Sequence, residues 1–427
     1  MFHLKTPPLH IRHFLWLLPL IFLFVLGCAQ RETDIGANAV TGLTENKFAT
    51  LSGTATHSTD WHPPFSNGLG TSLEVGNAKN LFAFFAIRFD AVTGLPDSVR
   101  VDSMEIRLYH ASVWPSVRDL QGLQVRIREI PDSVIWTEGT LVPGQFPTRE
   151  NYPIIDSVVL SANSSDSLAS FPVKNPQEMW HKWHADSGKG LIIEPRSDIS
   201  GGNGGFIEFY SHEESSLIDP NYPPALLIHG AAQVNDSVFS PDTTVLAYPQ
   251  YDGYLVIDST DINQPQQHVG RMVITQGMAQ RGAIYFPVDT ITNQFSRSVS
   301  RAILHLYADT LNPLRIQYVG QTMTLNHGYL LDSTWISHPD SLTLNRLLGP
   351  ESGVTGYGTW NSTSSELVFD VTGIVSTWVT DPSRNDGIQV FSGNELNTLE
   401  REVFYGADAD SVNKRPKLDI WYTEISH

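Results

Sequence analysis

The sequence predicts an all-β protein with two tandem antiparallel β-sandwich domains, jelly-roll-like in form, that arise from an internal duplication. Two observations lead to this prediction. Apolar and polar residues alternate along many short segments separated by turn residues, and four sequence blocks recur in the same order later in the chain. At 427 residues the chain also exceeds the size at which a single core usually keeps growing.

The alternation identifies the strands. In the segment "SMEIRLYH", Met104, Ile106 and Leu108 alternate with polar residues, and "RAILHLYA" and "LQVRIREI" repeat the pattern. Such strands place one face on a core and the other in water. Turn signals such as "PDSV", "NDSVF" and "LDSTW" separate the runs, because Asp and Ser side chains close turns and a β-branched residue starts the next strand. No long helical period competes, so an antiparallel sandwich is expected.

The repeated blocks define two units. They are too long for solenoid repeats, so they are interpreted as duplicated domains that each bury a core. We expect a first domain at 51–230, a linker at 231–244 and a second domain at 245–427. The matched blocks are "AIRFDAVTGL" from Ala86 with "AIYFPVDTIT" from Ala283, "FPVKNPQEMW" from Phe171 with "FDVTGIVSTW" from Phe369, "GLIIEP" from Gly190 with "GIQVFS" from Gly387, and "FIEFYSHEESS" from Phe206 with "REVFYGADADS" from Arg401.

Residues 1–27 are predicted to be a lipoprotein signal peptide. Lys5 and Arg12 give a positive start, and the apolar run "FLWLLPLIFLFVL" is shorter than the roughly 20 residues that span a bilayer. The run ends in "VLGC", which resembles the lipobox of bacterial lipoproteins and would make Cys28 the acylated residue. The alternatives are an ordinary signal peptide with an incidental cysteine, and an uncleaved anchor.

A lipid on Cys28 predicts a bacterial cell-envelope protein that is anchored to a membrane, because two or more acyl chains give stable anchoring. The polar residues 28–50 would form a tether. Ala29 is not the Asp that, by resemblance to well-studied lipoproteins, retains such proteins in an inner membrane, which favours the outer membrane or cell surface. Cys28 is the only cysteine, so no disulfide or thiolate metal site is expected.

The net charge of -18 argues against nucleic acid as a partner, because the averaged field repels phosphate backbones. It also argues against polyanionic glycans, unless a local basic patch forms, for instance from Arg126, Arg128 and Lys182.

The second unit contains "ILHLY", "FDVTGIVSTW", "NDGIQV" and a closing "RPKLDIWY" in this order. These motifs resemble the DNRLRE family of secreted β-sandwich modules, which is related to the jelly-roll carbohydrate-binding modules. The resemblance covers most of the chain from Leu51 onward and implies the fold far more strongly than a function. The first unit departs from the pattern, because Pro172 and Lys174 stand where the second unit has Asp370 and Thr372.

Four tryptophans recur in both units and are interpreted as core residues rather than binding residues. A strand followed by a helical turn would place the last indole of each "F-x-V" block over the edge of the sandwich. The four are Trp180 with Trp378, and Trp136 with Trp335.

Aromatic residues without a counterpart in the other unit are the candidate ligand-binding residues, because a domain whose sibling lacks them does not need them to fold. Exposed indole and phenol rings stack on the apolar face of a sugar. The alternative is that each packs under a loop or between domains. The candidates are Trp61, Trp114, Tyr248, Tyr251, Tyr254, Tyr357 and Trp360; Trp183 is also unmatched.

Candidate metal ligands are few. Asp408 and Asp410 occupy alternate positions in "GADADSVN" and could contribute to a structural calcium site, and Asp258 with Asp261 is a second such pair. The alternative is an acidic, solvated turn in each case. His181 and His184 are three residues apart but lack a third ligand at a suitable spacing, which favours a solvated pair.

No catalytic motif is present, and duplicated catalytic sites would be expected to keep their acids in both units. Asp370 has Pro172 opposite it, and Glu138 has Ser337. The leading expectation is therefore a non-catalytic envelope lipoprotein that binds polysaccharide or a cell-surface glycan. The alternatives are a structural or adhesive surface protein that contacts protein partners, and a glycan-active enzyme.

Overall fold

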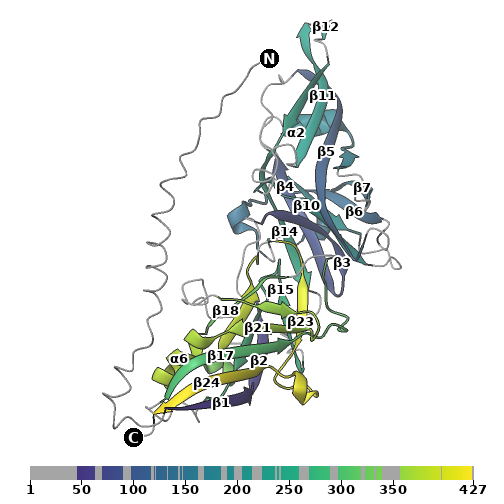
Figure 1. Cartoon of the computed structure of the whole chain (residues 1–427). Coiled ribbons are helices and arrows are strands. Elements are labelled where there is room, and N and C mark those ends of the chain that lie inside the picture. Colours follow the sequence, from purple (N-terminus) through teal and green to yellow (C-terminus); the bar gives the residue numbers. More distant parts are fainter. Residues whose placement is uncertain are drawn as a thin grey trace, which may run out of the picture. The chain divides into compact units, whose positions relative to one another are not determined.

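The predicted all-β class is confirmed. The described residues form antiparallel sheets with two α-helices, α2 (Pro176–Trp183) and α6 (Thr372–Thr380), and residues Phe48–Thr423 pack as one compact unit (Figure 1). The computed structural model describes residues 46–425 except 63–69, 90–97, 117–119, 121, 132, 143–144, 147, 162–167, 184–189, 197–203, 214–223, 236–237, 240–241, 259–268, 289–296, 319–322, 331–332, 339–355 and 396.

The first half of the protein comprises β3 to β12, residues 72–239. Its strands form a curled sheet around one large core. The sheet order is β12-β11-β5-β10-β3-β4-β9-β6-β7, and β8 pairs with β5. The bounds are β3 (Ser72–Ala78), β4 (Leu81–Phe89), β5 (Val99–Trp114), β6 (Gly122–Glu129), β7 (Ile154–Ser161), β8 (Leu168–Pro172), β9 (Leu191–Pro195), β10 (Gly205–Tyr210), β11 (Ala225–Asn235) and β12 (Val238–Phe239).

Strands of the second half form a five-stranded sheet, β1-β24-β17-β21-β20, a second five-stranded sheet, β19-β18-β22-β16-β2, and the pair β15-β23. They enclose a separate core. The bounds are β1 (Asn46–Thr54), β2 (His57–Trp61), β15 (Arg271–Thr275), β16 (Arg281–Tyr285), β17 (Arg297–Tyr307), β18 (Leu325–Tyr329), β19 (Gly356–Tyr357), β20 (Thr359–Asn361), β21 (Glu366–Asp370), β22 (Ile388–Ser392), β23 (Arg401–Tyr405) and β24 (Lys417–Ile425).

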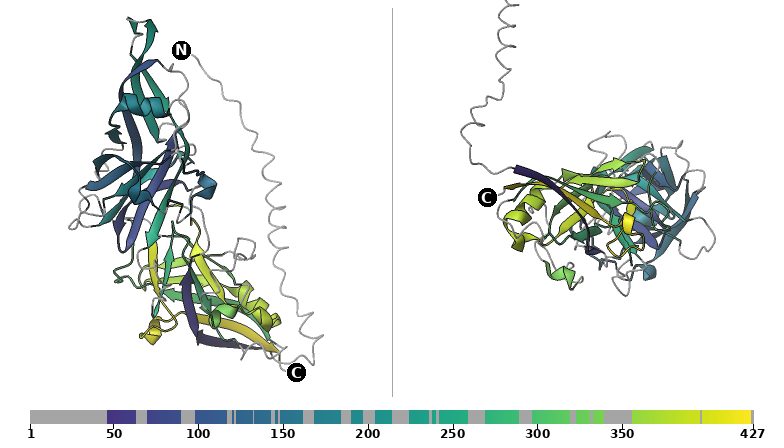
Figure 2. Two further views of the ribbon diagram at one scale, coloured as in Figure 1. Left: turned by 180° about the vertical axis from the view of Figure 1, so that it is seen from behind. Right: turned by 60° about the horizontal axis from the view of Figure 1, so that its bottom comes forward.

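Two strands from each half of the sequence pair with the sheets of the other half, and these four are called the lent strands. β1 and β2, from the start of the chain, pair with β24 and β16 of the second half. β13 (Thr243–Ala247) and β14 (Pro249–Asp258) pair in turn with β11 and β4 of the first half. In Figures 1 and 2 the purple β1 accordingly lies beside the yellow β24. Strand pairing therefore crosses the predicted linker in both directions, and the division at 231–244 stays a prediction.

The matched sequence blocks occupy matching places in the sheets. β8 and β21 pair with β5 and β17 respectively, and each is followed by a helix. The residue that directly follows each of these strands donates its backbone N–H to the paired strand. Val173, after β8, donates to Met104 at 2.8 Å, and Val371, after β21, donates to Ala302 at 2.9 Å. These contacts support the predicted duplication.

Two glycines show the same correspondence. Gly190 and Gly387 precede β9 and β22 with φ of +98° and +105°, where side chains are strained. A Cβ atom on Gly190 would lie 2.5 Å from the carbonyl oxygen of Ile87, and one on Gly387 would lie 2.7 Å from that of Ile284. A side chain is therefore excluded at both positions.

The four recurring tryptophans all lie in the cores. Trp180 and Trp378 are carried by α2 and α6 and fill the two large cores. Trp136 and Trp335 fill two smaller clusters that lie on the outer side of β9 and of β16. Packing rather than binding therefore accounts for the tryptophan that ends each "F-x-V" block, because neither indole is accessible.

Candidate functional site

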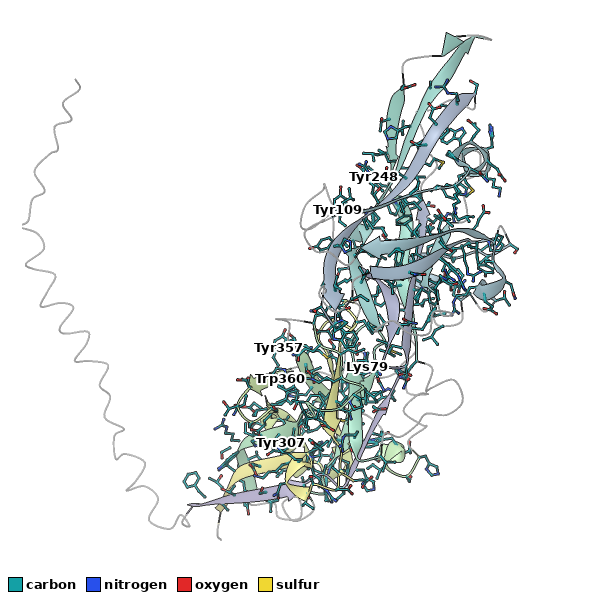
Figure 3. The ribbon with its side chains drawn as sticks, turned by 90° about the vertical axis from the view of Figure 1, so that its right-hand side faces the viewer. Lys79, Tyr109, Tyr248, Tyr307, Tyr357 and Trp360 are labelled. Atoms are coloured by element: carbon teal, nitrogen blue, oxygen red, sulfur yellow. The ribbon has the colours of Figure 1, made fainter. Side chains whose placement is uncertain are left out.

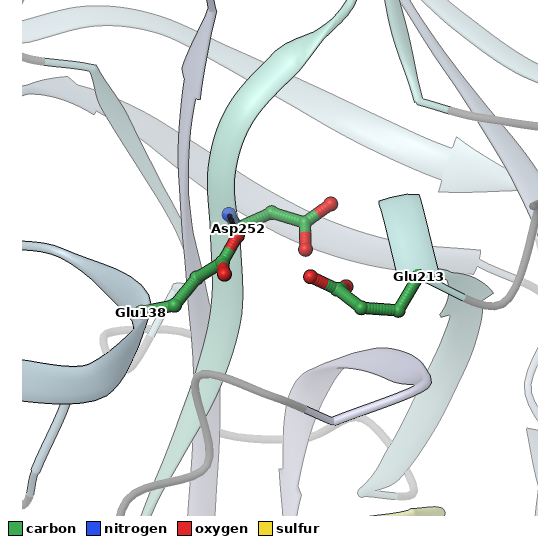
Figure 4. Close-up of side chains that lie close together, drawn as sticks. All are labelled: Glu138, Glu213 and Asp252. Carbon is green, nitrogen blue, oxygen red and sulfur yellow. Dashed lines mark hydrogen bonds between the residues drawn. The ribbon is translucent and has the colours of Figure 1, made fainter.

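Three acidic side chains from distant parts of the chain meet in the first half. Glu138 begins the short 3-10 helix η2 (Glu138–Thr140), Glu213 follows β10, and Asp252 lies on β14, the lent strand. One carboxylate oxygen from each residue lies within 4.8 Å of one from each of the other two. Figure 4 shows the three groups facing each other. Among the described residues, these three side chains lie close enough together to hold one metal ion.

Asp252 is the centre of this acidic cluster, which comprises Glu138, Glu213 and Asp252. Its side chain is 0% exposed. Oδ2 accepts a hydrogen bond from the backbone N–H of His212 at 2.9 Å, and the backbone N–H of Asp252 donates to Glu138 Oε1 at 3.4 Å. Oδ1 is buried and receives no hydrogen bond from a described amide or hydroxyl group. A buried carboxylate oxygen without a donor is costly unless a proton or a cation lies beside it.

Burial and mutual repulsion shift the acidity of the cluster. Burial, then the nearby Glu213 carboxylate, raises the pKa of Glu138 to about 7. The same two causes raise the pKa of Asp252 well above its usual range. The cluster therefore resists carrying three negative charges on its own.

Two aromatic side chains lie near the cluster in the sequence, and a cation from the neighbouring strand packs on one of them. Tyr251 packs edge-on against Trp136, with 6.1 Å between ring centroids, and the guanidinium of Arg88 lies 5.6 Å from the Tyr251 ring. The β14–β4 register shifts between Pro249 and Tyr251, which is the kind of bulge that re-aims side chains at functional sites.

The second half lacks the acidic cluster although it keeps the backbone hydrogen bond beside it. The backbone N–H of Ala407 donates to Ser58 Oγ at 2.7 Å, in the place of the bond from His212 to Asp252. The matched sequence blocks place Asp408 opposite Glu213, and the recurring Trp136 and Trp335 place Ser337 opposite Glu138. The second half thus has one carboxylate where the first has three.

Two of the predicted ligand-binding residues are core residues. Trp61 is buried against Ala283, Leu330 and Trp335. The Tyr254 side chain is buried and its hydroxyl donates to the carbonyl oxygen of Asn397. Neither ring has a face available for a ligand.

The apparent lack of a counterpart for Trp61 follows from the strand exchange. Ser58 lies opposite Ile284 in the β2–β16 pair, and Asp252 lies opposite Ile87 in the β14–β4 pair. Counting along each strand places Leu255 where the other half has Trp61. Leu255 packs in the cluster of Trp136, as Trp61 packs in that of Trp335.

Other predicted ligand-binding residues are accessible to different degrees. Tyr357 on β19 is 74% exposed and Tyr248, between β13 and β14, is 44% exposed (Figure 3). Trp360 is half-buried and stacks on Phe404, with ring centroids 5.9 Å apart. Trp114 is also half-buried and lies under the Lys79 ammonium at 5.9 Å. Sequence reasoning missed Trp421, an exposed indole on β24.

The remaining predicted sites are dispersed. Asp408 and Asp410 are exposed and join no group of three metal ligands among the described residues. His181 hydrogen-bonds Gln177. The partners His184 and Asp261, and the lipidation residue Cys28, lie outside the described residues.

The basic patch suggested by the sequence does not form around Arg128. Its guanidinium is buried and bonds Glu194 and the carbonyl oxygen of Tyr152. Lys182 is paired with Glu129 at 3.3 Å. Both charges are therefore balanced locally.

A second group of buried acids lies where β3 and β10 meet residues 397–402. Glu74 and Glu208 are opposite each other in the β3–β10 pair. Glu74 accepts from the backbone N–H of Leu399 at 3.0 Å and from the Tyr318 hydroxyl. Burial, then repulsion by Glu208, raises the pKa of Glu74 well above its usual range. Burial, followed by repulsion from Glu402 and Glu208, raises that of Glu400 to about 7.

The raised pKa of Glu400 predicts that stability falls as pH rises. The folded state holds the proton more tightly than the unfolded state, so the stabilisation present below the unfolded pKa of 4.5 is lost as pH rises to about 7. The expected loss is about 3 kcal/mol in the free energy of unfolding. Urea unfolding from pH 4.5 to 7.5 should show this slope in the wild type and a smaller one in Glu400→Gln. Equal slopes would show that Glu400 ionises normally.

Comparisons with known proteins add no functional information. No protein-family model and no curated protein matches the chain. Among solved structures, the chain is similar at 7% identity to the Macrobrachium rosenbergii nodavirus, with a TM-score of 0.11, covering 100% of this chain and 96% of that one. It is similar at 8% identity to the infectious bursal disease virus VP2 subviral particle, with a TM-score of 0.11 and coverage of 90% and 78%. Likeness at this level carries no argument.

Proposed function

We propose that this chain is a non-catalytic lipoprotein of the bacterial cell envelope, anchored through Cys28, whose β-sandwich modules bind polysaccharide. The observation that carries the proposal is the exposure of Tyr357 on a sheet strand, three residues before the half-buried Trp360. A phenol ring in this position offers an apolar face on which a pyranose can stack. Within the described residues, no helix is long and apolar enough to cross a membrane.

The acidic cluster does not favour a glycoside hydrolase. Asp252 is fully buried and so has no access to a glycosidic oxygen. The acids therefore suit another purpose.

Polysaccharide binding is tested by affinity electrophoresis of the chain from Ala29 onward. This start keeps β1 whole, whereas a start at Leu51 would remove half of a strand that pairs with β24. Retention on at least one neutral polysaccharide is expected. Tyr357→Ala should weaken it about three- to tenfold, the effect of one aromatic contact, while Tyr357→Phe should preserve it because the ring remains. Retention that is equal in all three proteins would remove Tyr357 from the binding face.

A structural role between copies of the chain is a second candidate. β7 pairs only with β6 among the described strands, and Val159 and Ile154 on it are exposed. An edge strand with apolar side chains can pair with another chain. Sedimentation of the same protein would detect this as concentration-dependent association that Val159→Lys abolishes. An absence of both retention and association would contradict both candidates.

A further inference from the structure

The acidic cluster is not required by the fold. The second half pairs β2 with β16 as the first half pairs β14 with β4, but it has Ser58, Ser337 and Asp408 in the corresponding places, and there Ser58 accepts the equivalent backbone hydrogen bond. Three carboxylates facing one another are therefore an addition specific to the first half. An addition that concentrates negative charge in a partly desolvated site costs stability unless something offsets it.

The geometry suits one cation. Oxygens bound to the same Ca²⁺ at about 2.3–2.6 Å can be up to about 5 Å apart, and one oxygen from each of the three carboxylates lies within 4.8 Å of the other two. The fully buried Asp252 supplies an independent indication, because its carboxylate lies in the cluster and its Oδ1 is buried without a described donor. The group consists of oxygen ligands alone, with no thiolate or imidazole, which selects a hard cation over zinc.

We propose that Glu138, Glu213 and Asp252 bind a single Ca²⁺ ion. Three carboxylates supply between three and six oxygens, and water completes the usual six to eight. Mg²⁺ fits less well, because proteins usually hold it through one or two carboxylates with several retained waters. The ion offsets two of the three negative charges. It also joins η2, the segment after β10 and the lent strand β14, so it fastens an exchanged strand to the half that receives it.

The site differs from the calcium site expected from the sequence. That expectation rested on Asp408 and Asp410, whose spacing in one exposed turn brings no third acid near them among the described residues. Asp408 nevertheless occupies the position that corresponds to Glu213. This makes Asp408 a matched control, because it is the same kind of residue at the same place in the fold but without the two other carboxylates.

The test uses the chain from Ala29 onward, stripped with EDTA, and CaCl₂ as the probe. Isothermal titration should give one Ca²⁺ per chain, and saturating Ca²⁺ should raise Tm by about 3–8 °C through preferential binding to the folded state. Terbium should bind at the same place and show luminescence excited through Trp136, two residues before Glu138. Asp252→Asn should abolish the calorimetric signal, the Tm shift and the terbium emission.

The controls separate loss of the site from loss of the fold. Asp252→Asn is isosteric and should unfold in EDTA at a temperature equal to or above that of the wild type, because it removes one repelling charge. Asp408→Asn should retain wild-type Ca²⁺ binding. The proposal is overturned if the wild type gives no heat and no Tm shift, which would leave the cluster as acids that share protons. It is also overturned if binding survives Asp252→Asn or disappears with Asp408→Asn. Glycan retention does not enter these readouts, so this result and that of the proposed function are independent.

Discussion

Arg401→Met should lower the free energy of unfolding by about 3–5 kcal/mol, because it leaves a buried carboxylate without its cation. Arg401 on β23 is 2% exposed, and its Nη2 donates to Asp258 Oδ2 at 2.6 Å. Nε donates to Thr275 Oγ1 at 3.2 Å. Asp258 ends the lent strand β14 and is itself buried, so solvent cannot replace the guanidinium. Urea unfolding at neutral pH measures the loss.

Two controls test whether the loss depends on the burial of Arg401 and on the charge of its partner Asp258. Arg100 pairs with Asp102 at 2.8 Å but both side chains are about half exposed, so Arg100→Met should be indistinguishable from the wild type in the same measurement. Adding Asp258→Asn to Arg401→Met should recover part of the lost free energy of unfolding, since the buried carboxylate charge of Asp258 is then removed. A loss in Arg401→Met no larger than that in Arg100→Met would mean that Asp258 finds another partner or takes up a proton.

Trp378→Ala and Trp180→Ala should each lower the free energy of unfolding by about 3–5 kcal/mol. Both indoles are fully buried and fill the space between a helix and the core of its half. The cavity left by an indole cannot be filled by small movements of a close-packed core. Trp421→Ala is the matched control on an exposed strand position and should have a much smaller effect. Thermal and urea unfolding distinguish the three.

The same variants decide between packing and binding. If Trp378→Ala kept wild-type stability but lost polysaccharide retention, the indole would be a binding residue and its assignment to the core would be wrong. The expected result is the reverse, with retention unchanged wherever the variant is folded.

Local features of the fold could be predicted from the sequence because they depend on neighbouring residues. The alternation at Met104, Ile106 and Leu108 places these side chains in the core, and all three are buried on β5. The recurring blocks ending in Trp180 and Trp378 predict a strand, a helical turn and a core indole, and the structure has a helix and a buried indole at both places. Periodicity determines which face of a strand is apolar, and the structure keeps that assignment.

The strand exchange could not be predicted, because alternation says nothing about which strand lies alongside. β2 has the same pattern whether it pairs within its own half or with β16. The lack of an aromatic counterpart for Trp61 was therefore misleading. Its position is matched by Leu255, and the comparison of residue types alone hides the match.

The acidic cluster was equally hidden. Glu138, Glu213 and Asp252 are separated by long stretches of sequence and meet only because β14 is inserted beside β4. The sequence argues against catalysis at Glu138, because Ser337 stands opposite it. The same difference between the halves, combined with the burial of Asp252, is what now points to a cation.

The reciprocal exchange also changes what a broken backbone would mean. A single proteolytic nick between β12 and β13 would produce two polypeptides, but each would still contribute strands to the sheets of the other. The pieces would remain interlocked until β1, β2, β13 and β14 unpaired, and rejoining would need no diffusion of one piece toward the other. The covalent link between the halves is thus dispensable for holding them together once the chain has folded.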